Sequence, residues 1–151
     1  MASEKRVRAG RRSKRKGNDF EREVVNRLCT NGIQAERGYW QARGGEETPD
    51  VIVDGFWIEV SSGATADPEA KLDQAVKQAR RDVSIPSVLP VAVTRKKGSR
   101  SIVATMQFND LAQAVQANLY GIADFAVSFD FQQLVKIIGA AHGKPQKRST
   151  D

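Results

Sequence analysis

The chain has 151 residues, a formal net charge of +6 at pH 7, one cysteine and one histidine. This length suits one domain with a hydrophobic core. Cys29 alone cannot form an internal disulfide, and one cysteine with one histidine excludes the usual zinc sites and any histidine-based hydrolase or nuclease. No apolar segment approaches the roughly 18 residues of a membrane span, and the N-terminus has no apolar signal segment. We therefore expect a soluble intracellular protein of the cytoplasm, the nucleoid or a phage-infected cell.

Positive charge is concentrated at the N-terminus. Residues 1–16 contain eight bases and one acid, so the rest of the chain is close to neutral. Such a run is typically disordered when free and binds a polyanion, although a nuclear-localisation-like patch, a solubility tail or an RNA-binding arm would use the same charges. We predict a disordered basic arm at residues 1–15, a single domain at 16–141 and a flexible tail at 142–151. The candidate DNA contacts here are Arg11, Arg12, Lys14, Arg15 and Lys16.

A helix is predicted from Asn18 to Thr30, where apolar residues recur at helical spacing and Asn31-Gly32 follows as a C-cap signal. Glu21 projects inside the apolar stripe of this helix. A carboxylate there is costly to bury unless it is paired, hydrogen-bonded or bound to a metal ion. The alternative is a glutamate at the edge of the stripe that reaches water or a neighbouring base. The stripe consists of Phe20, Val24, Val25 and Leu28.

A short strand at residues 33–37 precedes a polar, glycine-containing segment from Gly38 to Thr48. Tyr39, Trp40 and Arg43 lie in this segment, where aromatic and arginine side chains could stack on bases and hold phosphates. Equally, Trp40 could pack in the core and the glycines could form a plain turn.

Asp54-Gly55 predicts a two-residue type I′ hairpin turn between two β-rich runs. That register places Val53 opposite Phe56 and Asp50 opposite Glu59. One face of the hairpin is then wholly apolar, and the other carries both carboxylates. Opposed like charges destabilise a sheet, so a divalent cation between them is one interpretation and hydration on an exposed face is the other. The apolar face comprises Val51, Val53, Phe56, Ile58 and Val60.

Further elements follow in the second half of the chain. Asp67-Pro68 is a strong N-terminal helix signal. The helix that it begins is expected to run to about Asp82, and a strand–helix–strand connection favours a mixed α/β sheet with helices on both faces. The other predicted elements are strands at Leu89–Thr94 and Ser101–Met106 and helices at Asn109–Tyr120 and Phe131–Ala141.

The sequence resembles the PD-(D/E)xK nuclease superfamily, and within it the archaeal-type Holliday junction resolvases. The resemblance covers about residues 16 to 106. It depends on Lys16-Gly17-Asn18-Asp19-Phe20-Glu21-Arg22-Glu23, Arg37, Pro49-Asp50 and Ile58-Glu59-Val60. It implies a restriction-endonuclease-like core of helix, three strands, helix and two strands, here with extra C-terminal helices. The acidic active-site residues implied are Glu21, Asp50 and Glu59, with the Val60 carbonyl as a further metal ligand.

One position departs from the family pattern. The family has lysine two residues after the second acid, and here that residue is Ser61, which cannot offset charge on a phosphate. A base from elsewhere could replace the lysine, with Lys71 on the following helix the first candidate and Arg43 the second. Alternatively, two metal ions could carry the electrostatics while Ser61 hydrogen-bonds water. The third account is that catalysis is lost and only DNA binding remains. Gln74 is similarly placed to a glutamine of related nucleases, or is a solvated helix residue.

The resemblance implies a metal-dependent endonuclease that cuts opposed strands of four-way DNA junctions as a C2 homodimer, by attack of metal-activated water. Mg²⁺ or Mn²⁺ is the expected cofactor, with no organic cofactor and no membrane partner. A non-catalytic DNA-binding protein of the same fold and a less selective phage or repair nuclease are the alternatives. Backbone phosphates would be held by the basic arm together with Lys16, Arg22, Arg37 and Arg43.

Overall fold

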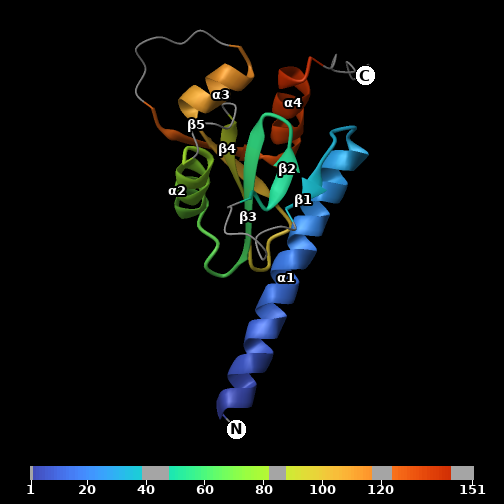
Figure 1. The fold of residues 1–151 in the computed structure, drawn as a ribbon, viewed down its shortest axis with the longest axis vertical. Coiled ribbons are helices and arrows are strands. Elements are labelled where there is room, and N and C mark those ends of the chain that lie inside the picture. The colour runs from blue at the N-terminus through green and yellow to red at the C-terminus, as the bar shows by residue number, and fades with distance from the viewer. Residues whose placement is uncertain (1, 39–47, 82–87, 117–123, 144–151) are drawn as a thin grey trace.

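The structure is a computed structural model that describes residues 2–38, 48–81, 88–116 and 124–143, with side chains from residue 15 onward. A six-stranded sheet in the order β1-β2-β3-β4-β5-β6 forms its centre, with helices on both sides (Figure 1). β3 and β4 are parallel, and the other neighbours are antiparallel. The elements are α1 (Ala2–Thr30), β1 (Glu36–Arg37), β2 (Val51–Val53), β3 (Phe56–Gly63), α2 (Pro68–Ala79), β4 (Leu89–Lys96), β5 (Val103–Gln107), α3 (Phe108–Ala114), β6 (Ala126–Asp130) and α4 (Phe131–Ala141). The predicted α/β class and the order of helix, three strands, helix and two strands are confirmed.

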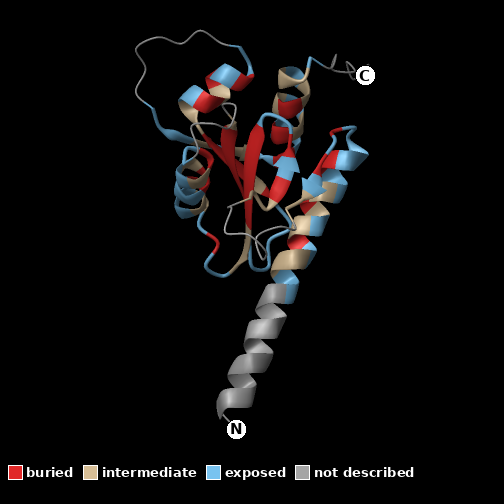
Figure 2. Ribbon diagram, viewed as in Figure 1, coloured by how far each residue is buried: buried red, intermediate tan, exposed pale blue. Residues whose placement is uncertain are grey.

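The two faces of the sheet bury different amounts of apolar surface. α1 and α4 pack on one face over the main core, which includes Phe20, Ile58 and Leu134. α2 covers the other face with a small cluster of Trp57, Ala75 and Ala79. Buried residues therefore run along both faces of the central strands (Figure 2). Burial of apolar surface on this scale is the main source of the fold's stability.

α1 begins at Ala2 rather than Asn18, so this helix includes the residues of the predicted basic arm. Disorder of the arm in the free protein stays a prediction. This segment has no proline and is rich in arginine and lysine, which are good helix formers. The helix continues past the body of the domain despite repulsion between its like charges (Figure 1). Binding of the arm to a polyanion stays a prediction.

Several element boundaries also differ from the predictions. β1 has two residues instead of five, because only Glu36 and Arg37 pair with β2. Ile33 and Ala35 are buried in the core before the strand begins. α2 ends at Ala79. α3 ends at Ala114, two residues before Gln116, which has a left-handed φ of 56°. The predicted helix ends at Asp82 and Tyr120 lie outside the described residues.

β6 is a strand that the sequence analysis missed. It pairs with β5 at the edge of the sheet, from Val103 opposite Asp130 to Gln107 opposite Ala126. Its residues alternate between exposed and half-buried, with Val127 and Phe129 on the half-buried face and Phe129 packed against the main core. Asp130 then caps α4 by accepting a hydrogen bond from the Gln133 N–H at 2.9 Å, and this helix agrees with the prediction.

The chain after α4 is also more ordered at its start than predicted. His142 Nε2 lies 2.8 Å from the Asp54 carbonyl oxygen, and its ring meets Phe56 edge-on. The predicted flexible tail therefore does not begin at His142, and residues 144–151 lie outside the described part. Within that part, none of the helices combines the length and apolar character needed to span a lipid bilayer.

Candidate active site

The β2–β3 hairpin has the predicted register but a different turn. Val53 pairs with Phe56 and Val51 with Ile58. Gly55 has φ +77°, whereas Asp54 is not at positive φ, so this is not the type I′ turn, which needs positive φ at both positions. The register survives because two turn residues still join the strands. Continued by one pair, it places Asp50 across from Glu59.

The two faces of the hairpin are both covered, each by a different helix. The predicted apolar face is buried in the main core from Val51 to Val60. On the other face Trp57 and Glu59 are buried under α2, and the Glu59 residue is only 1% exposed. The interpretation of Glu59 as a hydrated surface acid is therefore excluded.

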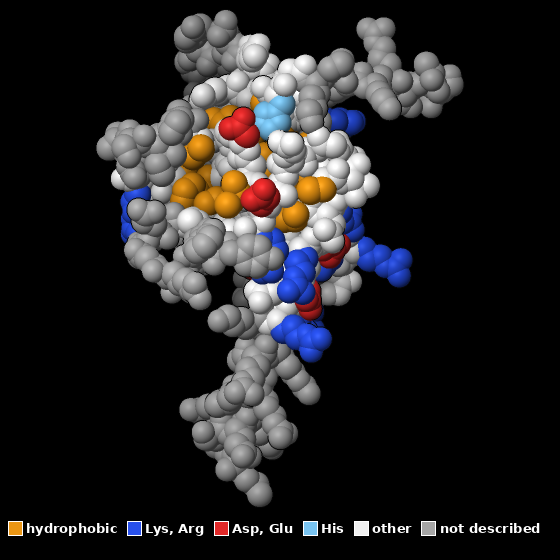
Figure 3. Space-filling model, turned by 45° about the vertical axis from the view of Figure 1, so that its right-hand side comes forward, with side chains coloured by type: hydrophobic (Ala, Val, Ile, Leu, Met, Phe, Trp, Pro, Cys, Tyr) orange, Lys and Arg blue, Asp and Glu red, His pale blue; other side chains and the backbone are white. Residues whose placement is uncertain are grey.

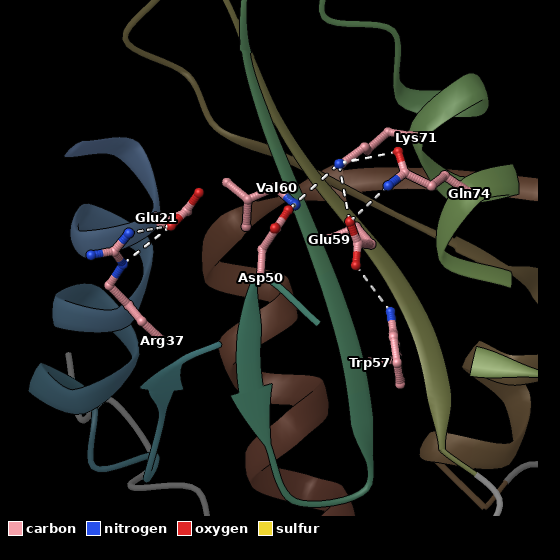
Figure 4. Close-up of polar contacts among 8 residues, drawn as sticks. All are labelled: Glu21, Arg37, Asp50, Trp57, Glu59, Val60, Lys71 and Gln74. Atoms are coloured by element: carbon pink, nitrogen blue, oxygen red, sulfur yellow. Dashed lines mark hydrogen bonds and ion pairs between the residues drawn. The ribbon is translucent and has the colours of Figure 1, made fainter. Parts of the chain in front are cut away.

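Three donors from two elements hold the Glu59 carboxylate (Figure 4). Trp57 Nε1 donates to Oε1 at 3.0 Å, two residues earlier on the same strand face. Gln74 Nε2 donates to Oε2 at 3.2 Å, and Lys71 Nζ lies 3.0 Å from the same oxygen. Lys71 also donates to the Gln74 Oε1 at 3.2 Å. The carboxylate is thus fixed by hydrogen bonds on both oxygens.

Asp50 is tied to the same group. Its Oδ2 accepts a hydrogen bond from the Val60 N–H at 2.8 Å and lies 3.5 Å from Lys71 Nζ. Lys71 therefore reaches both carboxylates of the hairpin. Lys71 is the residue that the sequence analysis named first as a replacement for the missing motif lysine. Its catalytic role stays a prediction.

Local sequence explains why Lys71 faces the hairpin. Asp67 Oδ1 accepts hydrogen bonds from the N–H groups of Glu69 and Ala70 at 3.0 and 3.3 Å, which fixes the start of α2 as predicted. Leu72 and Ala75 are buried against the sheet. Lys71 and Gln74 are three residues apart and so lie on one side of the helix, beside this buried stripe.

The environment of Glu59 raises the pKa of its carboxyl to about 7 from 4.5. Burial is the largest cause, because it disfavours the charged form, and the negative charge of Asp50 adds to it. Lys71 and the hydrogen bonds from Lys71 and Trp57 act in the opposite direction. One ammonium therefore does not balance two carboxylates at this site.

Glu21 lies apart from this group. Its Oε2 accepts hydrogen bonds from Arg37 Nε and Nη2, at 3.1 and 2.5 Å, so the pair joins α1 to β1. Figure 4 shows this pair with no contact to Asp50 or Glu59. Among the described residues no three acidic, histidine or cysteine side chains are grouped closely enough to hold a metal ion. In this structure Arg37 holds Glu21 apart from the two hairpin acids, and the convergence of the three acids on a metal ion stays a prediction.

The remaining predicted site residues lie in varied surroundings. Ser61 is half-buried on β3 and makes no side-chain hydrogen bond to any residue that the structure describes. Arg22 is exposed and lies 3.7 Å from Asp19. Arg15 and Lys16 are exposed on α1. Arg43 lies outside the described residues, and the side chains of Arg11, Arg12 and Lys14 are not among those described.

Trp57 is a contact that the sequence analysis missed. The signal was available, since Trp57 and Glu59 are two residues apart and side chains two apart lie on the same face of a strand. Gln74 was noted, but its alternative as a solvated helix residue was left open. Gln74 is exposed on α2, and its side-chain amide also donates a hydrogen bond to Glu59.

Comparisons with known proteins add little to this geometry. No protein-family model matches the chain, and no curated protein sequence is significantly similar to it. Among solved structures the chain is similar to Hjc, a Holliday junction resolvase from the archaeal hyperthermophile Archaeoglobus fulgidus, with 14% identity. The match covers 79% of this chain and 99% of Hjc, with a TM-score of 0.48. These values are too low to transfer an activity, so the functional case depends on the side chains.

Proposed function

We propose that this protein is a metal-dependent, structure-selective DNA endonuclease that resolves four-way junctions. The observation that supports it is the group formed by Asp50, Glu59 and Lys71, with contacts of 3.0 and 3.5 Å from Lys71 Nζ to the two acids. Two acids and a lysine are the residue types of the PD-(D/E)xK pattern. Lys71 on α2 would take the role of the motif lysine, whose position in this sequence is held by Ser61.

The donor set of this group fits a hard divalent cation. Asp50 and Glu59 offer carboxylate oxygens, the ligands that Mg²⁺ and Mn²⁺ prefer. The two acids share one ammonium and the pKa of Glu59 is raised, so added positive charge is favourable there. We propose that Asp50, Glu59 and the Val60 carbonyl hold the ion, and that Glu21 joins them if it leaves Arg37. The ion would supply Lewis-acid chemistry, which stabilises charge on a phosphate and makes water a better nucleophile.

The chain's own residues would do the rest of the work. Lys71 would offset negative charge that develops on the scissile phosphate and orient the attacking water. Trp57 and Gln74 would keep the Glu59 carboxylate in one orientation through their hydrogen bonds. The Val60 N–H would do the same for Asp50. Ser61, next on the strand, would hydrogen-bond water near the reacting phosphate.

The substrate and assembly follow from the same proposal. The basic arm, Lys16, Arg22, Arg37 and Arg43 would hold backbone phosphates, which gives preference for DNA structure rather than sequence. A four-way junction has approximate two-fold symmetry and needs two cuts. A C2 homodimer of this chain would match that symmetry.

The decisive experiment is a nicking assay on a synthetic four-way junction with Mg²⁺ or Mn²⁺. We expect Asp50→Asn to abolish nicking while junction binding persists. Asp54→Asn is the matched control, because Asp54 is an exposed turn residue of the same hairpin. Absence of nicking by the wild-type protein with either metal would contradict the proposal. Equal cutting of linear duplex, flaps and junctions would keep the nuclease but replace the resolvase by a less selective phage or repair enzyme.

A catalytically impaired DNA-binding protein is the second candidate. It is favoured by the ion pair of Glu21 with Arg37 and by the contact of Lys71 with both hairpin acids, which together leave no three-acid group among the described residues. This candidate predicts tight junction binding with no nicking in either metal, for the wild type and for Asp50→Asn alike.

A further inference from the structure

A basic cleft lies between α1 and the ends of β3 and β4. Its volume is about 590 Å³, and its walls come from the first turns of α1 within the body, from Ser62 and its neighbours, and from the Lys96–Ser99 turn. Ser62 lies three residues after Glu59, so about 10 Å along β3 separates the cleft from the candidate active site. Strand alternation places Ser62 on the face of β3 that α1 covers, whereas Glu59 lies on the face that α2 covers. The cleft and the candidate active site therefore lie on opposite faces of the sheet and share no residue.

The acids of this cleft are already engaged. Glu23 Oε2 lies 2.6 Å from Arg95 Nη1, and its Oε1 lies 2.9 Å from Arg27 Nη2. Asp19, the other acid of the lining, has its Oδ1 3.7 Å from Arg22 Nη1. The Arg95 guanidinium also lies over the Phe20 ring, 4.4 Å from its centroid. Arg95 is thus a fixed part of the wall, held by a carboxylate and an aromatic face.

Three lysines of the cleft have no such counter-charge. Lys16 on α1 faces the cleft from one wall, and Lys96 and Lys97 from the other. None of the three makes an ion pair or a side-chain hydrogen bond with the described part of the chain. All three are exposed and line one cleft, so their positive charges are available to an anion there.

Backbone contacts fix the wall that carries Lys96 and Lys97. The Lys97 N–H donates to the Gly63 carbonyl at 3.1 Å, and the Ser99 N–H donates to the Lys96 carbonyl at 3.0 Å. Gly98 adopts φ +80°, which closes this turn without strain. The hydroxyl groups of Ser62 and Ser99 also line the cleft and can donate to phosphate oxygens.

We propose that this cleft binds the phosphate backbone of DNA, with one strand passing Lys16, Lys96 and Lys97 before it reaches the Asp50–Glu59 group. The identity of the polymer rests on the proposed function. A DNA backbone that contacts both places would bridge about 10 Å along β3 between the cleft and the reacting phosphate. The cleft would thus fix the distance between the phosphates bound by its lysines and the phosphodiester that is cut.

Continuity with the basic segment supports a polyanion as the occupant. Residues 1–16 carry eight bases, and Lys16, the last of them, lines the cleft. α1 projects from this end of the body (Figure 1), and Lys and Arg side chains gather there with a few acids, whereas hydrophobic side chains occupy the middle of the same view (Figure 3). A polymer of phosphates can contact the cleft and the projecting helix together, which a single small anion cannot.

The test measures binding of a four-way junction and of a linear duplex by full-length protein in EDTA, across a series of salt concentrations. We expect the double variant K96Q/K97Q to lower the slope of log affinity against log salt by about 1.8, since each phosphate contact contributes about 0.9. Affinities that converge near 1 M salt would then differ by about 60-fold at 0.1 M salt. Lys136→Gln on α4 is the control, because it removes one exposed positive charge outside the cleft lining and is compared with K96Q/K97Q per charge removed.

The outcomes separate this inference from the proposed function. If K96Q/K97Q has the same salt slope and DNA affinity as the wild type, the proposal that the cleft binds DNA is overturned. It is also overturned by an equal loss per charge removed in Lys136→Gln, which would show a general charge effect, or by tighter binding of single-stranded RNA than of duplex DNA. If K96Q/K97Q shows the expected slope change while the wild type nicks no substrate in Mg²⁺ or Mn²⁺, the proposed cleft is supported and the proposed endonuclease activity is contradicted.

Discussion

Two acid–base groups flank the β2–β3 hairpin, and they differ in how their charges balance. Glu21 and Arg37 form a one-to-one pair whose side chains are 21% and 12% exposed. Asp50, Glu59 and Lys71 instead place two carboxylates against one ammonium, with the Glu59 side chain only 1% exposed. The first group can stabilise the packing of α1 on β1 without any ligand. The second keeps unbalanced negative charge, so it is the group whose state depends on pH, metal ions or phosphate.

Removal of Lys71 should give the largest effect. In Lys71→Met the two hairpin acids lose their shared cation, and we expect junction nicking to fall by about 10²- to 10³-fold with little change in DNA affinity. The free energy of unfolding should fall by about 3 kcal/mol at pH 8, because breaking a buried pair leaves uncompensated charge. Single-turnover kinetics and urea denaturation measure the two effects.

Lys77→Met is the control for this substitution. Lys77 is exposed in the last turn of the same helix, so its loss should change neither turnover nor stability measurably. Near-normal turnover of Lys71→Met would remove Lys71 from the mechanism and leave Ser61 with two metal ions as the account of the missing motif lysine.

The pH dependence of stability should distinguish the two groups. The pKa of Glu59 is about 7 in the folded protein, whereas the ordinary value of 4.5 applies once the chain unfolds. Between these values the folded chain holds a proton that the unfolded chain has lost, so the free energy of unfolding falls as pH rises through this window and levels off above about pH 7. The fall should be at most about 3 kcal/mol. Urea denaturation in EDTA from pH 4.5 to 8 measures it.

Glu59→Gln should flatten that window, because glutamine carries no titrating proton. Glu21→Gln should retain it, although the variant leaves Arg37 without the carboxylate that it contacts in the wild type. A wild-type fall that persists unchanged in Glu59→Gln would assign the pH dependence to another group, and Asp110 is then the next candidate, since burial raises its pKa as well.

The same two groups show which parts of the candidate site could be predicted from the sequence. Turn length and strand alternation were enough to place Asp50 and Glu59 on one face, since both are local rules with a period of two. A capping aspartate and a proline located the start of α2, and hence Lys71. These short-range signals account for every residue of the Asp50–Glu59–Lys71 group.

The Glu21–Arg37 pair could not be deduced in the same way. Its members come from elements that meet only in the tertiary fold, and Arg37 could equally have faced solvent or phosphate. β6 was missed although a signal was present, because Val127 and Phe129 alternate with Ala126, Ser128 and Asp130 over five residues. The extent of α1 was missed because charge composition was given more weight than helix propensity.

Arg37→Met should have an intermediate effect and sharpen the contrast between the groups. We expect the free energy of unfolding to fall by about 2 kcal/mol, because Glu21 would be left half-buried without its partner. The pH window of Glu59 should not move, since Arg37 is not among the causes of its shift. Arg22→Met is the control, because its pair with Asp19 is exposed and worth little. A moved pH window in Arg37→Met would show that the two groups are electrostatically one.

The smallest effect concerns the turn that sets the hairpin register. Gly55 has φ +77° and open space within 4 Å of where a Cβ would lie, so Gly55→Ala should cost about 1 kcal/mol through backbone strain alone. Gly139→Ala is the matched substitution of opposite sign: Gly139 lies within α4, also with open space around it, and alanine there should stabilise the protein by up to about 1 kcal/mol. Thermal denaturation of both variants measures the difference. If Gly55→Ala leaves stability unchanged, the turn can adopt another conformation at no cost, and the alignment of Asp50 with Glu59 must then depend on the Val60 N–H and Lys71 rather than on the turn.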